Sequence, residues 1–131
     1  MNTFMNAFTS SDWTAYPFAS QNQKDFDNLL SVYLDSVFFP NLNELDFAQE
    51  GHRLEFSELH NRKSELVNKG IVFNEMKGAM SSVNSILWQT ITKNLFSNTT
   101  YHFNSGGEPE EIVKLTYEHF KNFHETHYHP S

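Results

Sequence analysis

The chain is 131 residues long, and its 38% hydrophobic and 19% charged residues are typical of a globular domain or part of one. The formal net charge of −7 repels phosphate groups, which excludes nucleic acid as a first choice of partner, and it only weakly favours basic peptides. The absence of cysteine excludes disulfide bonds and thiolate chemistry, and no apolar run approaches the roughly 18 residues that a membrane span needs.

Two antiparallel strands are predicted at the N-terminus. Residues 3–9 alternate loosely between two sets of side chains, and residues 14–18 are rich in β-forming residues. The polar residues 10–12 between them are typical of a turn. Pro17 indicates that the second strand is short or lies at an edge, because proline lacks a backbone N–H.

A helix is predicted next, since apolar residues recur at the helical i, i+3, i+4, i+7 spacing from Phe26 to Val37. Asn22 and Asp25 form a looser version of the capping box at its start. Pro40 ends the helix, because the residue before a proline disfavours helical geometry. A shorter helix is expected over residues 43–53.

The middle of the chain is less regular. Residues 55–69 (EFSELHNRKSELVNK) are polar and charged, and they fit either a surface loop or a short helix. Gly70 opens a new helical element, the pair Ser81-Ser82 marks a bend, and a second helix follows with its apolar residues on one face.

The last third is predicted to hold a short strand within residues 98–105, a loop at Gly106-Gly107 and a final helix from Pro109. Proline suits the first turn of a helix, and the glutamates beside it suit the positive end of the helix dipole. The apolar face of this helix is formed by Ile112, Leu115, His119, Phe120 and Phe123.

Strands first and helices after indicate the α+β class, with antiparallel strands followed by several helices packed on one face. A two-stranded hairpin is marginal by itself in water. The apolar helix faces call for a larger sheet than this sequence supplies. We therefore expect either a truncated domain or pairing between chains.

Glu75 is the most suggestive single residue. On a helix it shares a face with Ile71, Val72 and Ala79, which places its carboxylate toward the core. An unpaired charge there is costly, so it needs a cation, a hydrogen-bond network or a metal. The alternative is that this end of the helix is exposed, or that a nearby lysine pairs with the carboxylate.

Histidines cluster near the C-terminus. His124 and His127 are three residues apart, which is metal-ligand spacing on a helix. The run HETHYH nearly matches the zinc motif HExxH, but Tyr128 stands where the second histidine belongs. The alternative is a polar helix end whose histidines complement the dipole.

Several stretches, in the same order, resemble one protein family. They are TFMNAFTSSDWTAYPFASQN (3–22), LLSVYLDSVFFP (29–40), LDFAQEGHRLEF (45–56), KGIVFNEMKGAM (69–80), TYHFNSGG (100–107) and HYHPS (127–131). They resemble the presequence-protease branch of the pitrilysin/insulinase family of zinc metallopeptidases. The resemblance implies that residues 1–131 are part of the N-terminal catalytic-type domain of such an enzyme, truncated at both ends.

The resemblance also implies a zinc site. In the family, the inverted motif HxxEH supplies two histidine ligands and a general base, and a glutamate on a separate helix is the third ligand. That glutamate maps onto Glu75, in the segment VFNEMKG. HxxEH does not occur in this sequence and would lie upstream of Thr3. Because catalytic zinc takes three protein ligands, the isolated chain is expected to lack activity and tight zinc binding.

Asn6, Ala7 and Phe8 match the family's edge strand, to which substrate peptide adds as a further strand. Backbone pairing of this kind gives affinity with little demand on sequence. The alternative is an ordinary strand with Phe8 in the core. The implied parent is an endopeptidase that degrades unstructured peptides, located in the cytoplasm of bacteria or in mitochondria or plastids. Its implied partners are peptides and the rest of the parent chain, without a membrane or nucleic acid. A non-catalytic module that binds or self-associates remains the alternative.

Overall fold

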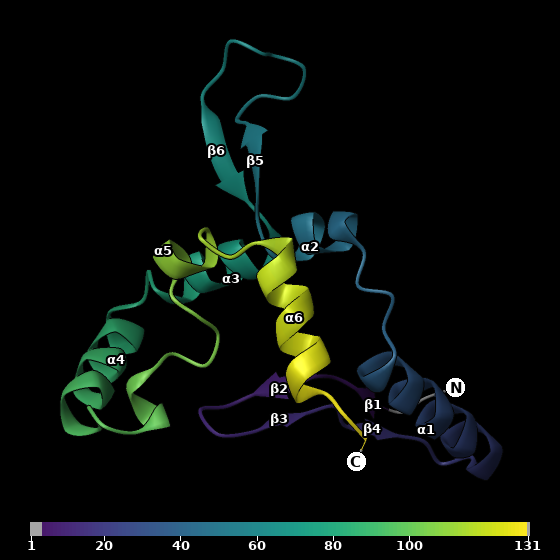
Figure 1. Cartoon of the computed structure of the whole chain (residues 1–131). Helices are drawn as coiled ribbons and strands as arrows, with labels where there is room; N and C mark the ends of the chain where they lie inside the picture. The colour runs from purple at the N-terminus through teal and green to yellow at the C-terminus, as the bar shows by residue number, and fades with distance from the viewer. Residues whose placement is uncertain (1–3, 131) are drawn as a thin grey trace.

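The computed structural model describes residues 4–130, in which short antiparallel strand pairs alternate with helices (Figure 1). The strands are β1 (Phe4–Met5), β2 (Phe8–Thr9), β3 (Thr14–Ala15), β4 (Phe18–Ala19), β5 (Arg53–Phe56) and β6 (Leu66–Lys69). The helices are α1 (Gln23–Phe38), α2 (Glu44–Glu50), α3 (Ile71–Ala79), α4 (Val83–Leu95), the 3-10 helix η1 (Thr100–His102), α5 (Pro109–Ile112) and α6 (Tyr117–His127). The α+β class is confirmed.

The N-terminal hairpin is present but divided into two short pairs. β1 pairs with β4, and β2 pairs with β3, with Phe8 opposite Ala15. Between the pairs, the Asn6 N–H donates to the carbonyl oxygen of Pro17 at 3.1 Å. Pro17 has no N–H to return that bond, which explains the interruption. The predicted turn is confirmed by a 2.8 Å bond from the Ser10 N–H to the Trp13 carbonyl.

Helix α1 begins and ends as its sequence predicts. The Asn22 side chain accepts a hydrogen bond from the Asp25 N–H at 3.1 Å, which satisfies one of the free donors of the first turn. The helix ends at Phe38, two residues before Pro40.

Aromatic contacts join the hairpin to α1. The ring of Phe18 in β4 lies 5.2 Å from that of Phe26 and 4.7 Å from that of Tyr33, measured between centroids. These tilted contacts hold α1 against the hairpin.

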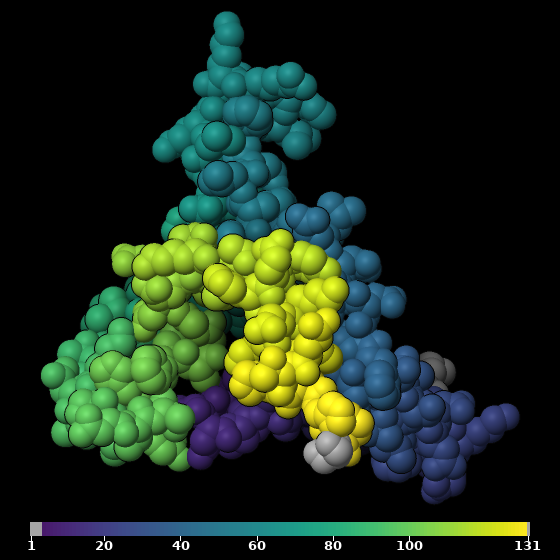
Figure 2. Space-filling model, viewed as in Figure 1, coloured from purple at the N-terminus to yellow at the C-terminus, as the bar shows by residue number. Residues whose placement is uncertain are grey.

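The prediction of a loop or short helix for residues 55–69 is wrong at both ends, where the chain forms the hairpin β5–β6. Arg53 lies opposite Lys69, and Phe56 lies opposite Leu66. The Glu55 carboxylate accepts bonds from Arg53 at 2.6 Å and from Lys69 at 2.9 Å. The hairpin projects from the rest of the molecule (Figures 1 and 2). Its charged residues pair across the ladder, which the polar composition does not distinguish from a loop.

Helices α3 and α4 are confirmed, with the predicted bend between them. Helix α2 is shorter than the predicted 43–53, because the chain leaves the helix at Gly51. Gly51 meets the start of α3, where its carbonyl oxygen accepts a bond from the Phe73 N–H at 3.3 Å. Gly70, directly before α3, is buried against this junction.

The predicted final helix is two helices. α5 ends at Ile112, and α6 starts after Thr116, whose side chain accepts a bond from the His119 N–H at 3.2 Å. This local cap supplies a second helix start within the apolar pattern. The strand predicted within 98–105 is wrong, since η1 occupies residues 100–102.

Little apolar surface is fully buried. Among residues 4–130, Phe73 and Ile112 are the buried hydrophobic side chains, at 8% and 6% exposure. The described strands form three separate pairs rather than one sheet, so the helices have no common sheet face to cover. None of the described helices is long and apolar enough to cross a membrane.

Candidate functional site

Glu75 lies on α3 with its side chain exposed, which corrects the expectation that it faces the core. Its neighbours on that face, Ile71 and Val72, are also 52% and 39% exposed. The helical periodicity is right, but no described segment covers this face of α3. Within residues 4–130, the Glu75 carboxylate forms no ion pair or hydrogen bond.

Glu75 lines a cavity of about 820 Å³ together with Ala7 and Thr9 of the N-terminal hairpin. The rest of the wall comes from Ser11, from α3 and Met80 after it, from α4, and from Tyr101 and residues 103–106. Glu75 is the cavity's one carboxylate, and none of the lining residues is Lys or Arg. Glu75 and Ala7 therefore line one cavity, whereas Asn6 and Phe8 lie outside this lining.

Of the groups that line this cavity, only the Glu75 carboxylate is suited to bind a zinc ion. A glutamate oxygen is a suitable zinc ligand, but catalytic zinc takes three protein ligands. In the described part of the chain, no three His, Asp or Glu side chains lie close enough together to hold a metal ion. Glu75 therefore has no pair of further metal-ligating side chains beside it among the described residues.

The C-terminal histidines are directed to separate carbonyl groups. The Nε2 atom of His124 donates to the Val37 carbonyl at 2.7 Å, and the ring stacks on Tyr128. The Nδ1 atom of His127 donates to the Phe123 carbonyl at 2.9 Å. His124 thus contacts the end of α1 and His127 contacts its own helix, so the two predicted ligands have separate partners.

Asn6 and Ala7 lie between β1 and β2, outside the paired strands. The Asn6 side-chain oxygen accepts a bond from the Ala7 N–H at 2.8 Å. Phe8 is 45% exposed and stacks on Phe4, so the alternative with Phe8 in the core is wrong.

A tyrosine pair near these residues has no signal in the sequence, because its members are 112 residues apart. The hydroxyl groups of Tyr16 and Tyr128 lie 3.1 Å apart and join the hairpin to the end of α6. Partial burial, and then the hydrogen bond to Tyr128, raise the pKa of Tyr16 to about 12. Both tyrosines line a cavity of about 950 Å³ that also includes Asn6 and Ala7.

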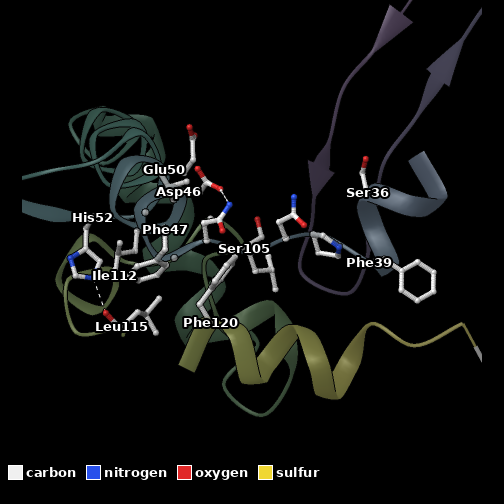
Figure 3. Close-up of a pocket in the computed structure, with 18 of the residues that line it drawn as sticks. Ser36, Phe39, Asp46, Phe47, Glu50, His52, Ser105, Ile112, Leu115 and Phe120 are labelled. Atoms are coloured by element: carbon white, nitrogen blue, oxygen red, sulfur yellow. Dashed lines mark hydrogen bonds between the residues drawn. The ribbon is translucent and has the colours of Figure 1, made fainter. Parts of the chain in front are cut away.

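Another cavity, of about 840 Å³, lies between the end of α1, α2 and the start of α6 (Figure 3). Phe47, Ile112, Leu115 and Phe120 are among its apolar lining residues. The Nε2 atom of His52 donates to the Leu115 carbonyl at 2.8 Å, drawn as a dashed line in Figure 3. The sequence indicates the apolar residues but not that they surround a common hollow.

Comparisons with known proteins agree with the motifs. No family model matches the chain. Mitochondrial presequence proteases of Xenopus tropicalis and Mus musculus are 58% and 55% identical to it over 131 residues. The protein HypA of Clostridium perfringens is 49% identical over 133 residues. Each match covers the whole chain but only 13% of the relative, so the chain spans about an eighth of the length of these curated relatives.

Proposed function

We propose, from the homology of this chain to one segment of the presequence proteases, that it forms part of a zinc metalloendopeptidase that degrades unstructured peptides. In this proposal Glu75 is the third zinc ligand. The other two ligands and the general base belong to an HxxEH segment outside these residues. Asn6, Ala7 and Phe8 form the strand to which substrate adds.

The observation that carries the proposal is the cavity shared by Glu75 and Ala7. A peptide that pairs with the backbone at Ala7 enters the cavity that Glu75 lines. Backbone pairing selects extended, unfolded segments because a folded protein has few free strand edges to offer. The Ala7 N–H can also change its hydrogen-bond partner, because it donates to a side-chain oxygen and not to another strand.

Each residue has a limited role in this chemistry. Zinc, when bound, supplies Lewis-acid activation of the scissile carbonyl group. Glu75 contributes a charged oxygen ligand whose negative charge lacks a partner among the described residues. Ala7 contributes a backbone donor and acceptor that orient the peptide. The chain alone lacks the remaining ligands and the base, so we expect it to be inactive.

The test compares Glu75→Gln with the control Glu44→Gln in the polypeptide that contains this chain together with its HxxEH segment. Glu44 is exposed in the first turn of α2 and lines none of the three cavities. We expect Glu75→Gln to lower zinc content and to reduce turnover of a quenched fluorescent peptide by at least about a hundredfold, a loss typical of disrupted metal sites. Full zinc content with unchanged turnover in Glu75→Gln would show that Glu75 is not a ligand.

A second function, a self-associating binding module, is favoured by one observation. Large apolar side chains remain exposed along α1, α4 and the β5–β6 hairpin. Surfaces of this kind mark interaction sites. A chain that acts only in this way would associate without zinc and would not depend on Glu75.

A further inference from the structure

The β5–β6 hairpin lacks the support that a short hairpin needs. It projects from the rest of the molecule, and no other described strand pairs with it (Figures 1 and 2). A hairpin of two strands is marginal in water, whereas three or more strands with an apolar face are stable. Leu54 and Leu66 lie on one face of this hairpin and are 66% and 54% exposed. A further strand beside the hairpin would therefore stabilise it.

The outer edge of β6 has free backbone groups. The Ser57 N–H donates to the Glu65 carbonyl oxygen at 2.8 Å, so these two opposing residues form a hydrogen-bonded pair within the hairpin. In an antiparallel ladder, such pairs alternate with pairs whose N–H and C=O groups point away from each other. The N–H and C=O groups of Leu66 and Asn68 therefore point to the open side of β6. An edge of this kind can pair with another strand.

The side chains along β6 are complementary to those of a second β6. Glu65, Val67 and Lys69 lie on one face, with the negative charge at one end and the positive charge at the other. Two antiparallel copies centred on Val67 place each Glu65 opposite Lys69 of the other copy, and opposite charges across a strand pair stabilise it. Glu65 forms no ion pair within residues 4–130, so its carboxylate is available.

The free backbone groups agree with this register. It places Leu66 of each copy opposite Asn68 of the other, and these are the residues whose N–H and C=O groups point outward. A register centred on Leu66 would instead place Lys63 opposite Lys69, which is unfavourable because like charges repel. Backbone and charge therefore select the same centre, Val67.

The edge of β5 is less suitable for pairing. Its two charged side chains, Arg53 and Glu55, already bond to each other at 2.6 Å. Arg53 also donates to the Ala48 carbonyl oxygen of α2 at 3.3 Å, which ties the start of β5 to that helix. The β6 edge has the unpaired charge, and we therefore assign the pairing to β6.

We propose that two copies of this chain pair antiparallel through β6, centred on Val67, and form one sheet of four strands. The apolar face of each hairpin then continues across the whole sheet, and the Glu65–Lys69 pairs join the copies. The proposal rests on the self-associating function above and gives it a defined surface. It does not depend on Glu75 or on zinc, so its failure would leave the peptidase proposal in place.

Two single substitutions test this register. Glu65→Lys makes both charges of β6 positive, and Lys69→Glu makes both negative, so each variant places like charges opposite each other. Each should associate at least about tenfold more weakly than the unmodified chain, measured by sedimentation velocity at roughly micromolar to millimolar concentrations. An equimolar mixture of the two variants should associate again, because each positive strand then lies beside a negative one.

The control is Glu125→Lys, which makes the same change of charge at an exposed position near the end of α6. It should change association by about twofold or less. The backbone chemical shifts of β5 check that the hairpin of each variant is folded, since Lys69 also bonds to Glu55 at 2.9 Å.

If Lys69→Glu does not fold, Asn68→Pro takes its place. Proline there removes an N–H that points outward and leaves the bonds between β5 and β6 intact, as proline on an edge strand does. Because each copy loses a backbone bond to the other, association should again weaken by about tenfold.

Four outcomes would overturn the proposal. A chain that stays monomeric over this concentration range has no second copy at β6. Equal losses in Glu65→Lys and Glu125→Lys would mean that association follows net charge. A mixture that does not recover would mean that the register is wrong. Undiminished association of Glu65→Lys and Asn68→Pro would mean that the copies meet through another surface, and the self-associating function would then stand without this pairing.

Discussion

Gly70 shows how tightly single residues are fitted where α3 begins. A Cβ atom at this position would overlap the Gly51 carbonyl oxygen and lie 2.6 Å from the Gly51 carbonyl carbon and 2.8 Å from the His52 Cα. These are backbone atoms, which cannot rotate away as a side chain can. We expect Gly70→Ala to lower the free energy of unfolding by about 1–3 kcal/mol, measured by urea denaturation.

Gly78 provides the matched control. It lies within α3, and a Cβ atom there would have no atom within 4 Å. Gly78→Ala should therefore raise the free energy of unfolding by about 0.5–1 kcal/mol, because alanine loses less backbone freedom in a helix. Equal effects of the two substitutions would contradict the close contact at Gly70.

The Tyr16–Tyr128 pair makes a pH-dependent prediction. The pKa of Tyr16 is raised to about 12, through burial and then the Tyr128 hydrogen bond, so the fold favours neutral Tyr16. Its contribution to stability is complete below pH of about 10, the unfolded pKa, and is lost as the pH rises through about 12. Tyr128→Phe should lower the Tyr16 pKa, measured by NMR of labelled tyrosine ring carbons. Because burial remains, the pKa should not fall fully to the unfolded value.

The β5–β6 hairpin gives a prediction at the scale of one element. Hydrogen bonds from Lys69, and then from Arg53, hold the pKa of Glu55 below its usual range. A lowered folded pKa means that this stabilisation is present above the unfolded pKa and is lost as the pH falls through the folded one. The backbone shifts of Val67 and Asn68 should therefore move toward unfolded values in acid. Glu55→Gln should lack this acid step, and Glu65→Gln should keep it.

The elements that could be predicted from the sequence are those whose signals are local. Apolar periodicity gives α1, α3 and α4, and the Asn22 cap fixes where α1 begins. The β5–β6 hairpin could not be predicted in this way, because its pairing joins residues such as Glu55 and Lys69 across a loop. The split of the last helix depends on the single cap at Thr116, which is easily hidden inside an apolar pattern.

The candidate site, too, could be predicted only where the sequence signal is local. Periodicity correctly groups Ile71, Val72 and Glu75 on one face of α3, but it does not say what covers that face. That Ala7 and Glu75 line one cavity depends on how distant segments are arranged. The zinc and substrate roles stay predictions that rest on the family resemblance.

At the scale of the whole molecule, the exposed apolar surface predicts association. Trp88 and Phe39 are 66% and 68% exposed, and few apolar side chains of residues 4–130 are buried. Contiguous apolar surface of this kind is uncommon on stable monomers. We expect the weight-average sedimentation coefficient of the purified chain to rise with concentration. A strict monomer at high concentration would mean that these side chains tolerate water without a partner.

The short turn at Ser105 and Gly106 borders all three cavities described above. A ligand bound in any one of these cavities would change the chemical shift of the same backbone amide. The Gly106 amide resonance therefore reports on all three cavities. Titration with different ligands would shift it in directions that identify which cavity each ligand occupies.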